Sequence, residues 1–167
     1  MIQTFAFSRR SLFSCLAAML LAGGPSFAAP ARDPVAILTA IYRRAVKGDG
    51  PNWSEQAERV KDLSKSLIAL WARTDPKLMP GELGPVDIDI IGATNGLTLA
   101  GFSIKAEKQD DKTATVAVTL AYRESGQRPN PTVIRYGFVR EDGQWKIDEF
   151  RGGGWSLREM LMRFLAD

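Results

Sequence analysis

The sequence contains no histidine and only one cysteine. Without histidine the chain lacks the commonest general base, the commonest transition-metal ligand and every His-dependent catalytic triad. The one cysteine is Cys15, which lies in the N-terminal segment, so residues 30–167 hold no disulfide, thiol nucleophile or thiolate ligand. We therefore expect no cofactor and no metal site, and any catalysis would depend on carboxylates.

An excess of charge of one sign is also lacking. The chain has 22 Lys and Arg residues against 19 Asp and Glu residues, which gives a formal net charge of +3. Arg9 and Arg10 belong to the N-terminal segment, so without residues 1–29 the balance is 20 against 19, a net charge of +1. Proteins that bind nucleic acid usually carry a basic patch or stripe. The composition thus argues against a nucleic-acid partner.

The first 29 residues have the three parts of an export signal. Arg9 and Arg10 supply positive charge, and residues 12–22 form a stretch of apolar and small residues that ends at a Gly-Gly-Pro break. Ser26 and Ala28 then place small residues where a signal peptidase reads the chain. An apolar core of roughly ten residues is too short to span a bilayer. The pattern predicts a cleaved signal peptide, no membrane anchor afterwards, and a periplasmic or secreted protein.

The export route stays open between two alternatives. Residues 8–13, Ser-Arg-Arg-Ser-Leu-Phe, resemble the twin-arginine motif, whose substrates usually leave the cytoplasm folded. An ordinary secretory signal that carries two arginines fits equally well. Cys15 lies inside the apolar stretch rather than after it, which argues against lipidation.

Residues 30–167 have the length of a single domain. Asp33 followed by Pro34 favours a helix start, and apolar residues at helical spacing continue toward Gly48. A second helix is predicted from about Ser54 to Asp75, with its charged residues on a solvated face. That face is expected to hold Glu55, Glu58, Arg59, Lys61, Asp62 and Lys65.

Beyond this helix a Pro- and Gly-rich stretch covers residues 76–96, within which residues 86–91 fit a short edge strand. The apolar period then changes to two, which is typical of strands. Four strands are predicted, at residues 97–108, 112–123, 132–141 and 145–151. Turn-rich links, such as Asp142-Gly143, indicate an antiparallel meander.

A last helix is predicted after Gly152-Gly153-Gly154, because Ser156 and Glu159 have the spacing of a capping box. The predicted fold is therefore α+β: N-terminal helices pack on a curved antiparallel sheet of about four strands, and a C-terminal helix follows.

This order of elements resembles the NTF2-like superfamily, in which N-terminal helices lead into a bent antiparallel sheet around a cone-shaped cavity. Within it, the chain resembles the exported bacterial family catalogued as domain of unknown function 3828, over most of residues 33–165. The segments that carry the resemblance are residues 33–42, 86–89, 135–143, 145–148 and 155–158. The resemblance implies a fold and a compartment but no reaction, since fold alone does not determine function.

Four groups of residues are candidates for contacts with a ligand or an anion. Asp87 and Asp89 are two residues apart, so on a strand their carboxylates would share a face and could hold a cation, or else simply be solvated. Asp148 lies near the end of the last strand, where catalytic members of the superfamily keep an acid. Its alternation with Ile147 instead predicts that it points away from a core lined by Trp145 and Ile147.

Arg151 and the three glycines after it precede a predicted helix start, where backbone N–H groups could hold an anion. The alternative is a swivel that lets the last helix fold back. Tyr136 and Trp155 belong to a set of aromatic residues that either lines a ligand cavity or fills the core.

The sequence therefore favours a non-catalytic binding module of the periplasm, whose partner would be an envelope protein, a peptide or a small molecule. The alternative is a small hydrolase or isomerase with a carboxylate base in the cone cavity. A carboxylate that faces an enclosed apolar cavity, with a raised pKa, would favour the enzyme.

Overall fold

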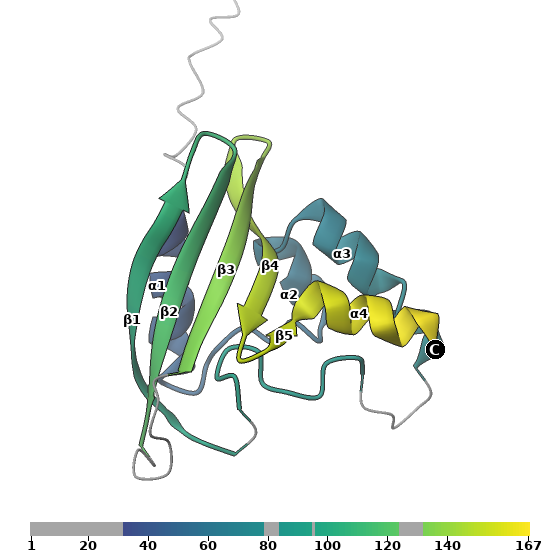
Figure 1. The fold of residues 1–167 in the computed structure, drawn as a ribbon, viewed down its shortest axis with the longest axis horizontal. Coiled ribbons are helices and arrows are strands. Elements are labelled where there is room, and N and C mark those ends of the chain that lie inside the picture. Colours follow the sequence, from purple (N-terminus) through teal and green to yellow (C-terminus); the bar gives the residue numbers. More distant parts are fainter. Residues whose placement is uncertain (1–31, 79–83, 95, 124–131) are drawn as a thin grey trace, which may run out of the picture.

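The computed structural model describes residues 32–78, 84–94, 96–123 and 132–167. It has an α+β architecture in which helices lie against a curved, five-stranded antiparallel sheet (Figure 1). Each strand pairs with the next one along the chain. The strands are β1 (Leu99–Gln109), β2 (Thr113–Tyr122), β3 (Thr132–Glu141), β4 (Gln144–Gly152) and β5 (Trp155–Ser156). The predicted signal peptide and its export motif lie outside the described residues.

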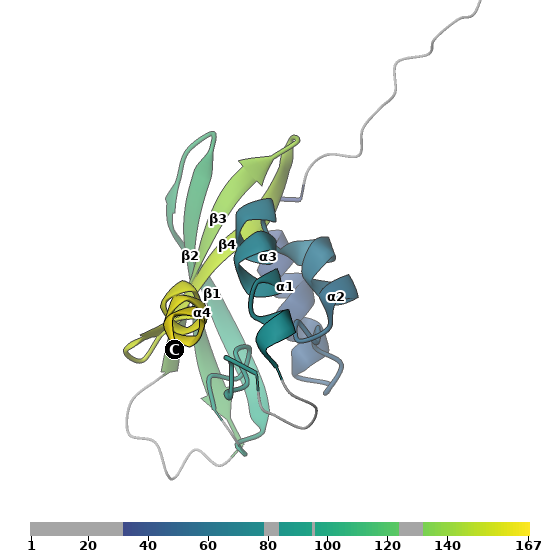
Figure 2. The same ribbon diagram turned by 90° about the vertical axis from the view of Figure 1, so that its right-hand side faces the viewer.

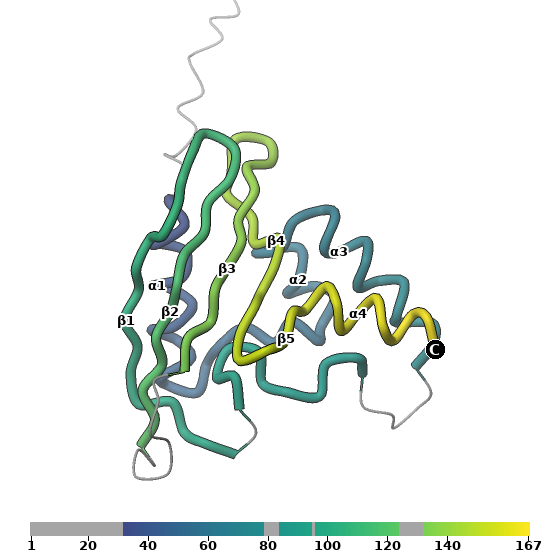
Figure 3. Tube along the Cα trace, viewed as in Figure 1, coloured from purple at the N-terminus to yellow at the C-terminus, as the bar shows by residue number. Residues whose placement is uncertain are grey.

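Three helices precede the sheet and one follows it, as the tube in Figure 3 traces. They are α1 (Pro34–Ala45), α2 (Gln56–Asp62), α3 (Lys65–Ala72) and α4 (Leu157–Ala166), with a 3-10 turn η1 (Asp75–Lys77) after α3. The predicted α+β class and C-terminal helix are thus confirmed. Within the described residues, no helix is long and apolar enough to cross a bilayer.

The predicted second helix is in fact two helices, because the chain leaves helical geometry at Leu63 and Ser64. Leu63 forms a bridge with Ile147 of β4, and the Ser64 N–H donates to the Ile147 carbonyl at 2.8 Å. The Ser64 side chain then begins α3 by accepting the Leu67 N–H at 3.0 Å, as serine does at helix N-caps. Contact with the sheet therefore breaks the helix.

The expectation of about four strands needs one correction, since β5 is a fifth, two-residue strand. It pairs with the end of β4 through a tight turn at Gly153 and Gly154. Both glycines have positive φ, 33° and 89°. A two-residue hairpin turn of this type requires positive φ at both positions, and residues other than glycine rarely adopt it.

The edge strand predicted at residues 86–91 does not form. Among the described residues, one isolated bridge, between Asp89 and Thr94, is the only strand-like pairing of this segment. The Asp89 carboxylate accepts the Ile91 N–H at 2.9 Å, which turns the chain locally in place of a strand ladder.

The core lies between the inner face of the sheet and the helices (Figure 2). Tyr42 of α1 meets Tyr136 of β3 there, with ring centroids 6.1 Å apart and an edge-to-face arrangement. Tyr136 also packs edge-on against Phe150 of β4 at 5.1 Å. Leu157 and Leu161 of α4 complete the same cluster of fully buried side chains.

Candidate functional site

Asp87 and Asp89 do not share the face of a strand, because their segment is not a strand. Both side chains are exposed, and the Asp89 carboxylate is engaged by the Ile91 N–H. A Cβ atom on Gly92 would clash with that carboxylate, so glycine at this position allows the close turn. The described residues contain no group of three or more acidic, Cys or His side chains placed to hold a metal ion.

Asp148 is placed by a bulge in β4 that the alternation of the sequence did not reveal. Ile147 pairs with Phe138 and Glu149 pairs with Gly137, so Asp148 is an extra residue between them. Trp145 and Ile147 are buried as expected, whereas Asp148 is only half-buried. Its side chain contacts the start of α3 and Arg158 of α4.

Three hydrogen-bond donors contact the Asp148 carboxylate. The hydroxyls of Ser64 and Ser66 donate to Oδ1 at 2.5 and 2.9 Å, and Nη2 of Arg158 approaches it at 2.5 Å. Burial by itself would raise the pKa of Asp148, but the two serine hydrogen bonds and the Arg158 charge outweigh it and lower the pKa. The carboxylate therefore stays ionised and links the start of α3 to α4. Because its pKa is lowered, it is also a weaker base, which does not suit general-base catalysis.

Arg151 is largely exposed, and its Nε lies 3.5 Å from the Glu149 carboxylate. Gly152 ends β4, Gly153 and Gly154 form the β4–β5 turn, and α4 begins only after β5. At that helix start, Glu149 accepts the Arg158 N–H at 3.3 Å, and Ser156 accepts the Glu159 N–H at 3.3 Å. The helix-end donors predicted to hold an anion thus already bind acceptors of the chain.

Tyr136 and Trp155 contribute to packing. Tyr136 is fully buried, and its hydroxyl lies 2.7 Å from that of Tyr42. The indole of Trp155 covers Gly152, where a Cβ atom would come within 3.0 Å of the ring. Of the two predicted roles for these aromatics, Tyr136 therefore has the second, filling the core. Trp155 lies half-buried over the β4–β5 turn.

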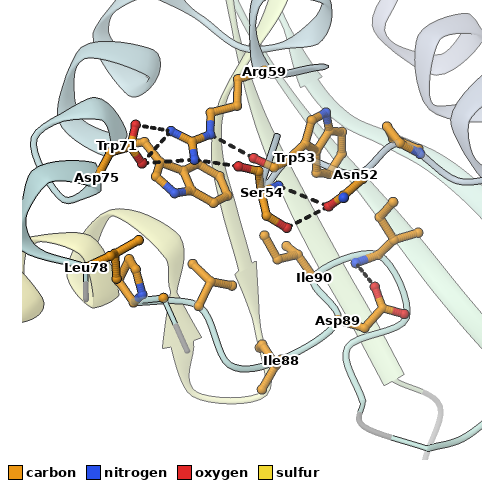
Figure 4. A pocket seen from close by; sticks show the side chains of 15 residues that line it. Asn52, Trp53, Ser54, Arg59, Trp71, Asp75, Leu78, Ile88, Asp89 and Ile90 are labelled. Atoms are coloured by element: carbon orange, nitrogen blue, oxygen red, sulfur yellow. Dashed lines mark hydrogen bonds and ion pairs between the residues drawn. The ribbon is translucent and has the colours of Figure 1, made fainter. Parts of the chain in front are cut away.

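The structure does contain a hollow that the sequence analysis did not anticipate. This hollow, the loop pocket, has a volume of about 430 Å³ and lies between segments 51–54 and 84–91 (Figure 4). Its wall is apolar and polar to a similar extent, and the apolar part includes Trp53, Trp71 and Leu78. Asn52 and Ser54 supply polar groups at one side, with the Ser54 hydroxyl donating to the Asn52 side-chain oxygen at 2.6 Å.

Arg59 holds one wall of the loop pocket together. Its Nε donates to the Trp53 carbonyl at 2.8 Å, one Nη donates to the Ser54 carbonyl at 2.8 Å, and both Nη atoms contact the Asp75 carboxylate at 3.1 Å. The guanidinium also lies over the Trp71 ring, 4.5 Å from its centroid. The dashed lines of Figure 4 show the hydrogen bonds of Arg59 to Asp75, Trp53 and Ser54, and the ring of Trp71 lies beside them.

Arg59 does not lie on the solvated helix face where it was expected. Its side chain is only 4% exposed, whereas the neighbouring apolar Val60 is 58% exposed. The break at Leu63 changes which face of α2 meets the core. The one feature of the sequence that could have indicated a partner for Arg59 is the carboxylate of Asp75, beside Pro76. The two residues are not at a helical spacing, so the sequence does not connect them.

No family model, curated protein or solved structure matches this chain. The geometry of the chain itself therefore carries the functional argument.

Proposed function

We propose that this chain is an exported, non-catalytic binding protein with the NTF2-like cone fold, and that it takes a small, mainly apolar ligand in the loop pocket. The order of helices, curved antiparallel sheet and C-terminal helix supports the resemblance to that superfamily and to domain of unknown function 3828. The export part of the proposal rests on the pattern of residues 1–29.

One observation carries the choice of site: the inner face of the sheet is filled. Tyr42, Tyr136, Phe138 and Phe150 are at most 2% exposed and pack against one another. No ligand can occupy that space without displacing them. The loop pocket, by contrast, has about 430 Å³, within the roughly 300–1,000 Å³ range of small-molecule sites.

The chemistry of the wall defines the ligand class. The N–H groups of Arg59 are already taken by two carbonyls and Asp75, so the guanidinium is not available to recognise an anion. What is left combines indole and aliphatic surface with the polar groups of Asn52 and Ser54 and with the Asp89 carboxylate, which accepts the Ile91 N–H. An uncharged molecule with an aromatic or aliphatic body and one or two hydrogen-bonding groups fits this lining.

The enzyme alternative has less support. Asp148, the candidate base, is ion-paired with Arg158 and does not line the loop pocket. Burial raises the pKa of Asp62, but the Trp53 indole N–H donates to that carboxylate at 3.2 Å, and Asp62 does not line the loop pocket either. No carboxylate with a raised pKa among the described residues therefore meets the apolar pocket.

The test is a titration with N-phenyl-1-naphthylamine, an uncharged dye that fluoresces in apolar sites. We expect saturable binding of one dye per chain. Ile88→Trp fills the loop pocket and should weaken that binding at least tenfold. Val60→Trp, the same kind of change at an exposed residue outside the pocket, should leave it unchanged. Equal binding by the Ile88→Trp protein, or no saturable binding by the wild type, would contradict the proposal.

A further inference from the structure

A second hollow lies between the start of α1, the end of α2 and the β3–β4 hairpin. Its volume is about 750 Å³, and it shares no lining residue with the loop pocket. In both views of the ribbon the start of α1 lies close to the β3–β4 turn (Figures 1 and 2). Five cationic side chains border this hollow, the basic groove: Arg32, Arg44, Lys61, Arg140 and Lys146.

Charge is unevenly distributed here. The five cations face two carboxylates, Asp62 and Asp142, although the whole chain has nearly equal numbers of each sign. Asp142 is already paired with Lys65 outside the groove, at 2.6 Å. Within the described residues, no carboxylate lies within salt-bridge distance of Arg32 or Arg140. Two of the five cations are also paired outside the groove, Arg44 with Asp49 and Lys61 with Glu58. Arg32, Arg140 and Lys146 then remain against Asp62, so the rim keeps a smaller excess of positive charge.

Some of these cations are held in place by other contacts. The Arg140 guanidinium lies over the Trp145 ring, 5.8 Å from its centroid. The Lys146 ammonium donates to the Lys61 carbonyl at 2.7 Å, at the C-terminal end of α2. Such contacts reduce the side-chain entropy that a partner would otherwise have to remove on binding.

The floor of the groove is apolar. Ile37, Ala40 and Ile41 come from α1 and Trp145 from β4. The cations come from separate elements: Arg44 from α1, Lys61 from α2, Arg140 from β3 and Lys146 from β4. Asp62 lies among them and would repel a single small anion placed at the centre. These features suit a long ligand that presents several spaced negative charges and apolar groups between them.

We propose that the basic groove binds an extended acidic peptide segment of a partner protein. Its carboxylates pair with the rim cations, and its apolar side chains lie on the floor formed by α1 and Trp145. A membrane surface fits less well, because the apolar residues are recessed: Trp145 and Ile41 are both buried, whereas a membrane-binding face exposes its apolar side chains. The proposal concerns a site separate from the loop pocket and does not depend on it.

The experiment measures fluorescence anisotropy of a labelled twelve-residue peptide of alternating Glu and Leu, at 20 mM and 300 mM NaCl. We expect saturable binding at low salt and at least tenfold weaker binding at high salt. Arg140→Glu and Arg32→Glu should each weaken binding at least tenfold at low salt. The matched control is Arg73→Glu, since Arg73 is exposed at the end of α3 and lines neither hollow. Melting temperatures close to that of the wild type check that each variant is folded.

Several results would overturn the proposal. One is no saturable binding, and another is equal weakening by Arg73→Glu and Arg140→Glu. Displacement of the peptide by 10 mM inorganic phosphate would indicate a small-anion site instead. Binding to phosphatidylglycerol vesicles that depends on Arg140, without binding to the peptide, would indicate a membrane surface. Unchanged peptide binding by Ile88→Trp would show that the groove acts independently of the loop pocket.

Discussion

At the scale of single residues, the hydroxyls of Tyr42 and Tyr136 form a short chain of hydrogen bonds in the core. Tyr42 donates to the Ile91 carbonyl at 3.0 Å, so in the Tyr42–Tyr136 contact of 2.7 Å Tyr136 must be the donor. Burial raises the pKa of both phenols, Tyr42 most clearly, so both are neutral at physiological pH. The pair joins α1 to β3 and to the turn that holds Asp89.

This direction of donation predicts unequal effects of two similar substitutions. Tyr42→Phe leaves the Tyr136 hydroxyl and the Ile91 carbonyl without their partner, and should lower the free energy of unfolding by about 2 kcal/mol. Tyr136→Phe leaves the Tyr42–Ile91 bond intact and should cost about 1 kcal/mol or less. Urea unfolding of both single variants and the double variant measures this.

The double variant supplies the control for that prediction. Once Tyr42 is replaced, removing the Tyr136 hydroxyl eliminates a buried unpaired donor, so the second change should cost nothing further or restore stability. Equal losses for the two single variants, or strictly additive losses in the double variant, would contradict the proposed direction of donation.

At the scale of elements, the bulge in β4 joins parts that are far apart in the sequence. The bulged residue Asp148 contacts Ser64 and Ser66 at the start of α3, and Arg158 in α4. The Arg158 guanidinium also donates to the Asp148 carbonyl at 2.8 Å. One extra residue in a strand therefore fixes how two helices pack against the sheet edge.

Asp148→Asn tests this link through its dependence on pH. Contacts in the folded state lower the pKa of Asp148, so its stabilising effect is complete above the unfolded pKa of about 3.9 and is lost as pH falls through the lower folded pKa. We expect the variant to be about 2 kcal/mol less stable than the wild type at pH 7, since several donors then meet a neutral amide.

The difference between the two proteins should shrink as pH falls below about 4. Urea unfolding between pH 7 and pH 3 measures it, with Asp111→Asn, an exposed change in the β1–β2 turn, as the control. A difference that stays constant over this range would show that Asp148 acts through packing rather than through its charge.

Elements with a local signal were predictable from the sequence. Residues 132–141 form β3 with the expected bounds, because strict alternation leads into the Asp142-Gly143 turn. Both turn residues have positive φ, 49° and 77°, which Asp and Gly tolerate. The helix that opens at Asp33-Pro34 was predictable for the same reason: its cap is encoded in adjacent residues.

Features decided by distant contacts were not predictable. The helix break depends on Ile147, the burial of Arg59 depends on Asp75, and the placement of Asp148 depends on a bulge. None of these three features produces a periodic pattern in the sequence. The same holds for the two hollows, because each is lined by segments that meet only in the folded chain.

At the scale of the whole molecule, the core is filled by side chains, so both proposed binding sites lie outside it. In the loop pocket the one buried cation is neutralised by Asp75, whereas the basic groove has cations on its rim. The two hollows share no lining residue, so the two proposed ligands would not compete for the same side chains.

The proposed location has its own test in a Gram-negative host. Expressed from Met1, the chain should reach the periplasm and lose 28 or 29 residues, which intact mass of the periplasmic fraction measures. Replacing Ser26 and Ala28 by Arg removes the small residues that the peptidase reads, so the uncut chain should stay with the membrane. α1 begins at Pro34 with its own Asp33 cap, so cleavage removes no residue that starts the helix. An uncut wild-type chain in the cytoplasm would overturn the export proposal and, with it, an envelope partner for the basic groove.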